Sequence, residues 1–196
     1  TAVKKGAVAI IASIAPDERW TDSVAWVHSS DTRDALGCVA SALHNDPSSQ
    51  LKVAGITGTN GKTTTAFLLH HIMKDSWTRA GLLGTIKNSD GVNERGATLT
   101  TASADVIQRQ LGQMVENGCR GVAMEVSSHG IHQKRVDAVK FDVAIFTNLT
   151  QDHLDYHLTM DAYYEAKKAL FAGLQFQEGK KKPIAVVNLD DRYGEK

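Results

Sequence analysis

A glycine-rich segment at residues 55–65 has the residue types of a phosphate-binding loop. It follows the apolar stretch 51–56 and precedes a helical pattern, so backbone N–H groups and a helix start would face one anion. Lys62 adds a cation for the β- and γ-phosphates, and the Thr63 hydroxyl can ligate Mg²⁺. Ile56 stands where the strict pattern has glycine, so the loop is a variant. The simpler interpretation is a glycine-rich turn with a surface lysine.

An acidic residue, Glu125, stands at the end of a predicted strand and is followed by Ser-Ser-His-Gly at 127–130. Beside a phosphate loop, such a carboxylate can hold Mg²⁺ or its water shell. Otherwise it is an ordinary cap of the strand end. Arg135 follows shortly afterwards. It is suited to a bidentate carboxylate or phosphate partner, although a single exposed arginine is usually only solvated.

Two histidines and two aspartates lie within residues 152–157, after another predicted strand. One interpretation is a divalent-metal shell to which a neutral imidazole contributes. The other is a polar loop that caps the next helix. The absence of an H-E-x-x-H pattern and of a cysteine cluster argues against a structural zinc site.

Lys167 is a cation on the apolar face of a predicted helix, residues 161–171. Its neighbours three and four positions away are Tyr163, Tyr164, Leu170 and Phe171. Lys168 lies toward the edge of that face, near Glu165. Burial would lower the pKa of Lys167 and make it a competent nucleophile. The alternative is a lysine that buries only its stem.

The hydroxyl-rich stretch 98–103 leads into another predicted helix. It is either an ordinary N-cap or a group of hydroxyls that binds sugar or phosphate oxygens.

Composition excludes several classes of function. The chain has 196 residues with 22 basic and 22 acidic side chains. This balanced net charge does not favour binding to nucleic acid or to an anionic membrane. No apolar run is long enough to span a bilayer. Cys38 and Cys119 lie far apart in the sequence, and we expect both to be reduced, buried thiols of a cytosolic protein.

Strands alternate with helices, which predicts an α/β domain with a mainly parallel sheet flanked by helices and ligands at the carboxyl ends of the strands. A domain boundary is expected at the turn 46–49, and residues 88–96 are expected to be a polar loop or hairpin tip. The expected strands are 8–14, 24–27, 51–57, 80–86, 121–126, 141–147 and 184–188, and the helices are 32–45, 63–77, 104–117 and 161–171.

The expected core-facing residues of the first three helices are Leu36, Val39, Ala40 and Leu43, then Leu69, Met73 and Trp77, then Ile107, Leu111 and Met114. Asp31 is the expected N-cap of the first helix.

These motifs, in this order and spacing, resemble the Mur ligases, ATP-dependent ligases of peptidoglycan synthesis. The resemblance covers essentially the whole chain and is tightest over 51–191. It is carried by Gly58–Thr64, Thr100-Thr101, Glu125–Gly130, Thr147–Leu149 with Asp152–His157, Ala166-Lys167, and Asn188–Asp191.

The resemblance implies roles for individual residues. ATP would be bound by Gly58, Thr59, Asn60, Gly61, Lys62, Thr63 and Thr64. Thr63 and Glu125 would hold one Mg²⁺, and His153 and Lys167 would serve a second, with Lys167 carbamylated. Lys62, His153 and Lys167 would be the catalytic residues. Positions that contact the UDP-muramoyl-dipeptide would be Thr100, Thr101, Ser127, Gln133 and Arg135.

The implied reaction is the cytoplasmic addition of a third amino acid, meso-diaminopimelate or L-lysine, to UDP-N-acetylmuramoyl-L-Ala-D-Glu through an acyl phosphate. Residues 1–46 would be the C-terminal half of a UDP-binding domain and 51–196 an incomplete central P-loop domain. The amino-acid-binding C-terminal domain would be absent, and this part alone is expected to be inactive. A folylpolyglutamate synthase-like ligase, a nucleotide switch or motor ATPase, and a non-catalytic scaffold on the same fold are the alternatives.

Overall fold

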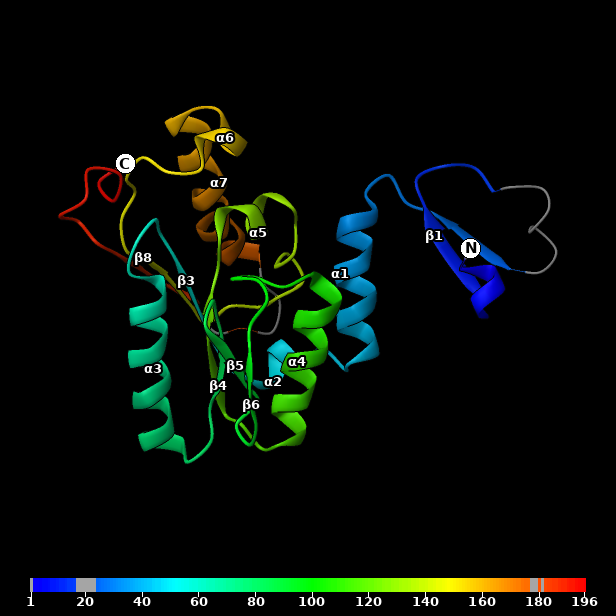
Figure 1. Ribbon diagram of the computed structural model, residues 1–196, viewed down its shortest axis with the longest axis horizontal. Coiled ribbons are helices and arrows are strands. Elements are labelled where there is room, and N and C mark those ends of the chain that lie inside the picture. Colours follow the sequence, from blue (N-terminus) through cyan, green and yellow to red (C-terminus); the bar gives the residue numbers. More distant parts are fainter. Residues whose placement is uncertain (1, 17–23, 177–179, 181) are drawn as a thin grey trace.

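A seven-stranded sheet in the order β6-β5-β4-β7-β3-β8-β9 forms the centre of the molecule (Figure 1). The computed structural model describes residues 2–16, 24–176, 180 and 182–196. The strands are β3 (Lys52–Thr57), β4 (Gly81–Leu83), β5 (Lys87–Ser89), β6 (Glu94–Gly96), β7 (Gly121–Glu125), β8 (Val143–Phe146) and β9 (Ile184–Val187). β4, β7, β3, β8 and β9 run parallel, and β5 and β6 add an antiparallel hairpin at one edge. The predicted mainly parallel sheet is therefore confirmed.

The central strand β3 brings the functional segments together. Ile56 is opposite Glu125 of β7, and Thr57 is opposite Phe146 of β8. Because these strands are parallel, the segments that follow each of them meet at one edge of the sheet. That edge is the upper one in Figure 1, where α3 begins.

Helices cover both faces of the sheet. α3 (Lys62–Trp77) packs on one face, where Ala66 joins Ile56, Leu82 and Ala123 in one buried cluster. α4 (Ala104–Glu116) and α7 (Met160–Ala172) cover the other face (Figure 1). Their apolar residues share the largest cluster with alternate strand positions; its members include Val53, Leu83, Ile107, Leu111, Met114, Val122, Met124 and Leu170. The helices thereby hold the strand ends, and the residues beyond them, in fixed positions.

Shorter helices complete the chain. They are α1 (Thr32–Leu43), α2 (Pro47–Gln50), α5 (Ser128–His132) and α6 (Leu154–His157), with 3₁₀ turns at Val3–Lys5 and Gly173–Phe176. Asp31 caps α1 as predicted, because its carboxylate accepts hydrogen bonds from the N–H groups of Arg33 and Asp34 at 3.0 and 3.2 Å. None of the described helices is long and apolar enough to cross a membrane.

The N-terminal part has a small sheet of its own, in which β1 (Ala9–Ala12) and β2 (Ala25–His28) pair in parallel. α1 links this sheet to the rest of the molecule and lies along α4 (Figure 1). Gly37 makes the close approach possible, since a Cβ there would lie 3.1 Å from Ala138 Cβ. An ion pair of 2.8 Å between Lys134 and Asp31 also joins α1 to the central domain.

The apolar stripe predicted for α1 is right for Ala40, which is buried, and wrong for its three larger members. Leu36, Val39 and Leu43 are exposed, Leu43 to 76%. The helix packs through Gly37 and Ala40, because small residues allow two helix backbones to come close. The prediction gave weight to large apolar residues and therefore missed Gly37.

Other local predictions also need correction. Cys38 is exposed, whereas Cys119 is buried as expected, and neither forms a disulfide. The turn at 46–49 contains the short helix α2, started by Pro47 at its first position. β4 is shorter than predicted and ends at Leu83, which leaves Ile86 exposed.

The two remaining helix predictions fared differently. In α4, Ile107, Leu111 and Met114 are buried as predicted. In α3, the predicted core residues Leu69, Met73 and Trp77 are only partly buried, and the fully buried positions are Ala66 and His70. The predicted hairpin at 88–96 is confirmed as β5–β6.

Candidate active site

The loop after β3 is shaped by two glycines with positive φ, Gly58 at 149° and Gly61 at 84°. A Cβ at Gly58 would overlap Thr147 Oγ1. The N–H of Thr59 donates to the backbone oxygen of Asn148 at 2.9 Å, and the N–H of Asn60 donates to Asn148 Oδ1 at 2.9 Å. The segment after β8 therefore supports the loop from one side.

We expect Gly58→Ala to weaken binding of Mg²⁺·ATP by at least about tenfold, because the side chain would strain the backbone and push Thr147 away. The measurement is calorimetric titration. Gly96→Ala is the matched control, since a Cβ there meets nothing within 4 Å. Unchanged affinity of the Gly58 variant would contradict the proposed loop geometry.

Lys62 lies over this loop. Its Nζ donates to the carbonyl oxygens of Gly58 at 2.9 Å and Thr59 at 2.8 Å. Burial lowers the pKa of Lys62, and the charges of Glu125 and Asp152 oppose that shift. A cavity opens beside the amine; it is lined by Thr59, Asn60, Gly61, Lys62, Thr63, Thr64, Thr85, Thr100 and Glu125. Six of the seven predicted ATP-binding residues, all except Gly58, thus line one cavity.

Glu125 is fully buried, with 0% of its surface exposed, yet it borders this cavity. Its Oε2 accepts hydrogen bonds from the hydroxyls of Thr63 at 2.8 Å and Thr85 at 3.0 Å. Its Oε1 accepts one from the N–H of Thr85 at 2.8 Å. Gly84 leaves room for the carboxylate, because a Cβ there would overlap Oε1. Sequence reasoning missed Thr85, which it placed inside a strand; the glycine before it was the available signal.

Lys167 points inward, as the helical spacing predicted. It is 2% exposed, and its Nζ donates to the oxygen of Gly58 at 2.9 Å, the same carbonyl that Lys62 contacts. Burial, followed by the charge of Lys62, lowers the pKa of Lys167 to about 7. Lys168 faces solvent and pairs with Glu165 at 3.1 Å. The interpretation of a lysine that buries only its stem is therefore wrong for Lys167.

The two histidines of the 152–157 segment lie in different surroundings. Within the described residues, no group of three or more His, Cys, Asp or Glu side chains is arranged to hold a metal ion. His157 is buried and its Nε2 lies 2.9 Å from Ser128 Oγ, which gives it a structural partner. His153 remains near the site, with its ring 5.9 Å from that of Tyr163, the residue under the Lys167 amine.

The residues predicted to bind the nucleotide sugar lie in one network beside Glu125. Thr101 is buried, and its hydroxyl donates to the backbone oxygen of Glu125 at 3.1 Å and accepts from the N–H of Ser127 at 2.9 Å. Arg135 donates through Nη1 to the backbone oxygen of Thr101 at 2.7 Å and through Nη2 to Gln133 Oε1 at 2.6 Å. Thr100 is the member of the threonine pair that borders the cavity.

The donor set fits ATP and Mg²⁺ in part. Glycine backbone, a desolvated lysine and a helix start suit phosphate, and the oxygens of Glu125 and Thr63 suit a hard cation. The Lys167 side chain ends in a nitrogen and, when protonated, is a donor only, so it does not by itself supply the oxygen ligand that Mg²⁺ prefers.

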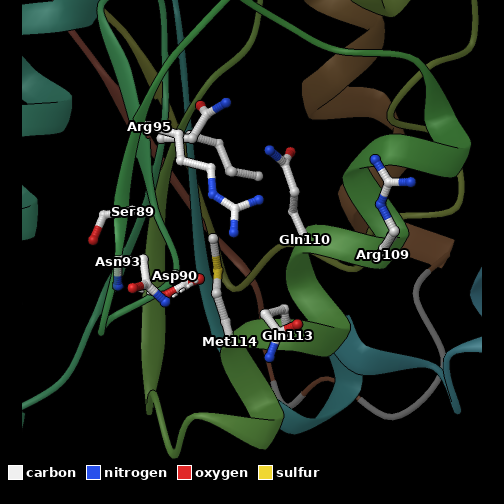
Figure 2. A pocket seen from close by; sticks show the side chains of 10 residues that line it. Ser89, Asp90, Asn93, Arg95, Arg109, Gln110, Gln113 and Met114 are labelled. Atoms are coloured by element: carbon white, nitrogen blue, oxygen red, sulfur yellow. Dashed lines mark hydrogen bonds between the residues drawn. The ribbon is translucent and has the colours of Figure 1, made fainter.

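A second groove lies between the β5–β6 hairpin and α4 (Figure 2). Figure 2 shows the side chains of Arg95 and Gln110 extending into it, over Met114. None of the predicted site residues lines this groove.

Comparisons with known proteins agree with this geometry. Residues 56–196 match the family described as Mur ligase middle domain. The chain is 41% identical over 191 residues to the UDP-N-acetylmuramoyl-L-alanyl-D-glutamate–2,6-diaminopimelate ligase of Geobacter metallireducens. This alignment covers 97% of this chain and 37% of that protein. It is 49% identical over 160 residues to the ligase of that name from Synechococcus elongatus. That alignment covers 82% of this chain and 31% of that protein.

Solved structures show the same fold. A structure of a ligase with that name superposes with a TM-score of 0.79 at 30% identity, over 99% of this chain and 37% of that one. A folylpolyglutamate synthase of Mycobacterium tuberculosis, at 13% identity and a TM-score of 0.60 over 82% of this chain and 42% of that one, shares the fold alone. The chain spans 37% and 31% of the lengths of these two curated relatives. Because the Mur ligase middle domain accounts for most of its residues, the chain belongs to the Mur ligase family.

Proposed function

We propose that this chain is the ATP-binding part of a ligase that adds the third amino acid to UDP-N-acetylmuramoyl-L-Ala-D-Glu. The single observation that carries the proposal is that two lysines, Lys62 and Lys167, meet at the Gly58 oxygen on the sheet edge where Thr63 also contacts Glu125. The relatives' names support the acceptor and, of the two candidate amino acids, favour a 2,6-diaminopimelate over L-lysine.

The proposed reaction has two steps. The γ-phosphoryl group of ATP is transferred to the carboxylate of the dipeptide, and the amine of the amino acid then attacks the acyl phosphate and releases phosphate. Lys62 and the backbone N–H groups at the start of α3 would bind the transferring phosphates. When bound to Thr63 and Glu125, Mg²⁺ would neutralise phosphate charge.

Lys167 and His153 are proposed to serve a second Mg²⁺, with Lys167 carbamylated. The support is chemical: a carbamate forms from a neutral amine and CO₂, and the lowered pKa of Lys167 provides that amine near neutral pH. The carbamate oxygens would replace a cation with an anionic ligand of the kind that Mg²⁺ prefers.

We further infer that residues 1–46 belong to a UDP-binding domain and 51–196 to the central domain. The separate β1–β2 sheet and the start of the family match at residue 56 support this division. A cytoplasmic location follows from the proposed role in precursor synthesis.

The test is ligation by the full-length protein. We expect phosphate release from ATP that requires both UDP-N-acetylmuramoyl-L-Ala-D-Glu and meso-diaminopimelate, with L-lysine as the competing amino acid. Mass spectrometry would identify the tripeptide product. Turnover of ATP that does not depend on the nucleotide sugar would overturn the assignment.

Arg135→Ala should raise the KM for the nucleotide sugar by about tenfold or more and leave the KM for ATP within about twofold. The guanidinium bridges Thr101 and Gln133 on the substrate side and makes no contact with the phosphate loop among the described residues. Arg109→Ala, an exposed arginine on α4, is the matched control. A defect confined to ATP would show that Arg135 is assigned to the wrong substrate.

A further inference from the structure

Thr85 holds both oxygens of the Glu125 carboxylate from a single residue. Its N–H donates to Oε1 at 2.8 Å and its hydroxyl donates to Oε2 at 3.0 Å. A backbone donor and a side-chain donor on the same residue fix the carboxylate plane as well as its position. Thr85 follows β4, the strand next to β7, so the sheet itself sets this geometry.

The same hydroxyl reaches the substrate side. Thr85 Oγ1 lies 3.1 Å from Thr100 Oγ1. The Thr85 hydroxyl is placed to donate to Thr100 Oγ1 and to Glu125 Oε2, and its single proton can serve one of these acceptors at a time. Thr85 therefore links Thr100 on the substrate side to the carboxylate of Glu125.

This arrangement leaves limited freedom at Glu125. A carboxylate has about four acceptor sites. Protein donors use three of them, two from Thr85 and one from the Thr63 hydroxyl. About one acceptor site of the Glu125 carboxylate therefore remains for another partner, and Glu125 borders the cavity beside Lys62.

We propose that Thr85 is a positioning residue that orients the cation-binding carboxylate of Glu125 and couples it to Thr100 on the acceptor side. This inference rests on the proposed function, in which Glu125 serves the metal on the phosphates. Without the Thr85 hydroxyl, Glu125 loses one donor and Thr100 loses its hydrogen-bond partner at position 85. Cation affinity and acceptor affinity therefore weaken together.

The test uses Thr85→Val, which has nearly the same shape but no hydroxyl, in the 196-residue chain. Binding of Mn²⁺ to the complex with ATP is followed by electron paramagnetic resonance. We expect the affinity for Mn²⁺ to fall about tenfold, the scale for one hydrogen bond to a charged group. Thr85→Ser restores the donor and should stay within about twofold of the unmodified chain. Thr98→Val, at an exposed threonine nearby, is the matched control.

A second readout separates positioning from general damage. In the full-length protein, Thr85→Val and Thr100→Val should each raise the KM for the nucleotide sugar, whereas only Thr85→Val should weaken Mn²⁺ binding. Thr85→Ala, checked by thermal unfolding, replaces the valine variant if that protein does not fold.

Wild-type Mn²⁺ affinity in a folded variant without the Thr85 hydroxyl would overturn this inference alone. Absence of metal-dependent ATP binding by the unmodified chain would overturn both this inference and the proposed function. Metal-dependent ATP binding without ligation of the nucleotide sugar would remove the proposed acceptor and leave the role of Thr85 at Glu125 in place.

Discussion

Replacement of Lys167 by alanine is expected to lower kcat of the full-length ligase on the order of 10³-fold and leave ATP affinity within about threefold. The proposed carbamate would supply an anionic ligand that acts on the transferring phosphoryl group, and this ligand would be lost. ATP affinity depends on the phosphate loop, where Lys62 still contacts Gly58. The measurement is steady-state kinetics combined with calorimetry. Lys168→Ala is the matched control, because that amine is exposed and forms an ion pair with Glu165 on the surface of the same helix.

The pH dependence follows from the lowered pKa of Lys167. Only the neutral amine reacts with CO₂, and the reaction releases a proton. With a pKa of about 7, the neutral fraction increases as the pH rises from 6 to 8, so carbamate formation should increase over this window. A lysine at its ordinary value would need a much higher pH. ¹³C NMR with labelled bicarbonate should show a carbamate signal that is absent from Lys167→Ala.

Near-normal activity of the Lys167→Ala enzyme would remove the carbamate from the proposed mechanism. Lys167→Met serves as a second variant, since it fills most of the same volume beside Tyr163 without an amine. Loss of activity in both, with intact thermal unfolding, would exclude a packing defect as the cause.

The phosphate loop was predictable because its chemistry is local. Residues 58–64 are contiguous, and a glycine turn between a strand and a helix has one dominant use. The face of α7 on which Lys167 lies was also predictable, since helical periodicity fixes which neighbours share that face. The spacing left open whether the amine or only the aliphatic stem of Lys167 is buried.

Contacts between segments that are far apart in the sequence were harder to predict. Thr85 meets Glu125 only because β4 lies next to β7, an order set by the sheet and not by sequence spacing. The packing of α1 through Gly37 was missed for a similar reason: its partner, Ala138, comes from a loop about one hundred residues later. His157 resembled a metal ligand in the sequence, yet its buried partner is Ser128.

Replacement of Lys62 by alanine should weaken Mg²⁺·ATP binding by about 10²-fold, the scale of a lost hydrogen-bonded charge. The amine now donates to the Gly58 and Thr59 carbonyls at 2.9 and 2.8 Å, within reach of the phosphates that the start of α3 would bind. Because a lysine at this position contacts the β- and γ-phosphates, the loss should be largest for ATP, smaller for ADP and near zero for AMP. Calorimetric titration of all three nucleotides measures this order.

Lys74→Ala is the matched control for this series, because it removes an exposed lysine from the same helix and should change none of the three affinities. The graded effect also separates two causes. If Lys62 mainly stabilised the empty loop through Gly58 and Thr59, its removal would weaken all three nucleotides by a similar factor. A contact with the terminal phosphates weakens ATP most, since only ATP has the γ-phosphate. Equal affinities of the Lys62→Ala and unmodified chains for ATP would refute the phosphate-binding role of this loop, and with it the ligase assignment.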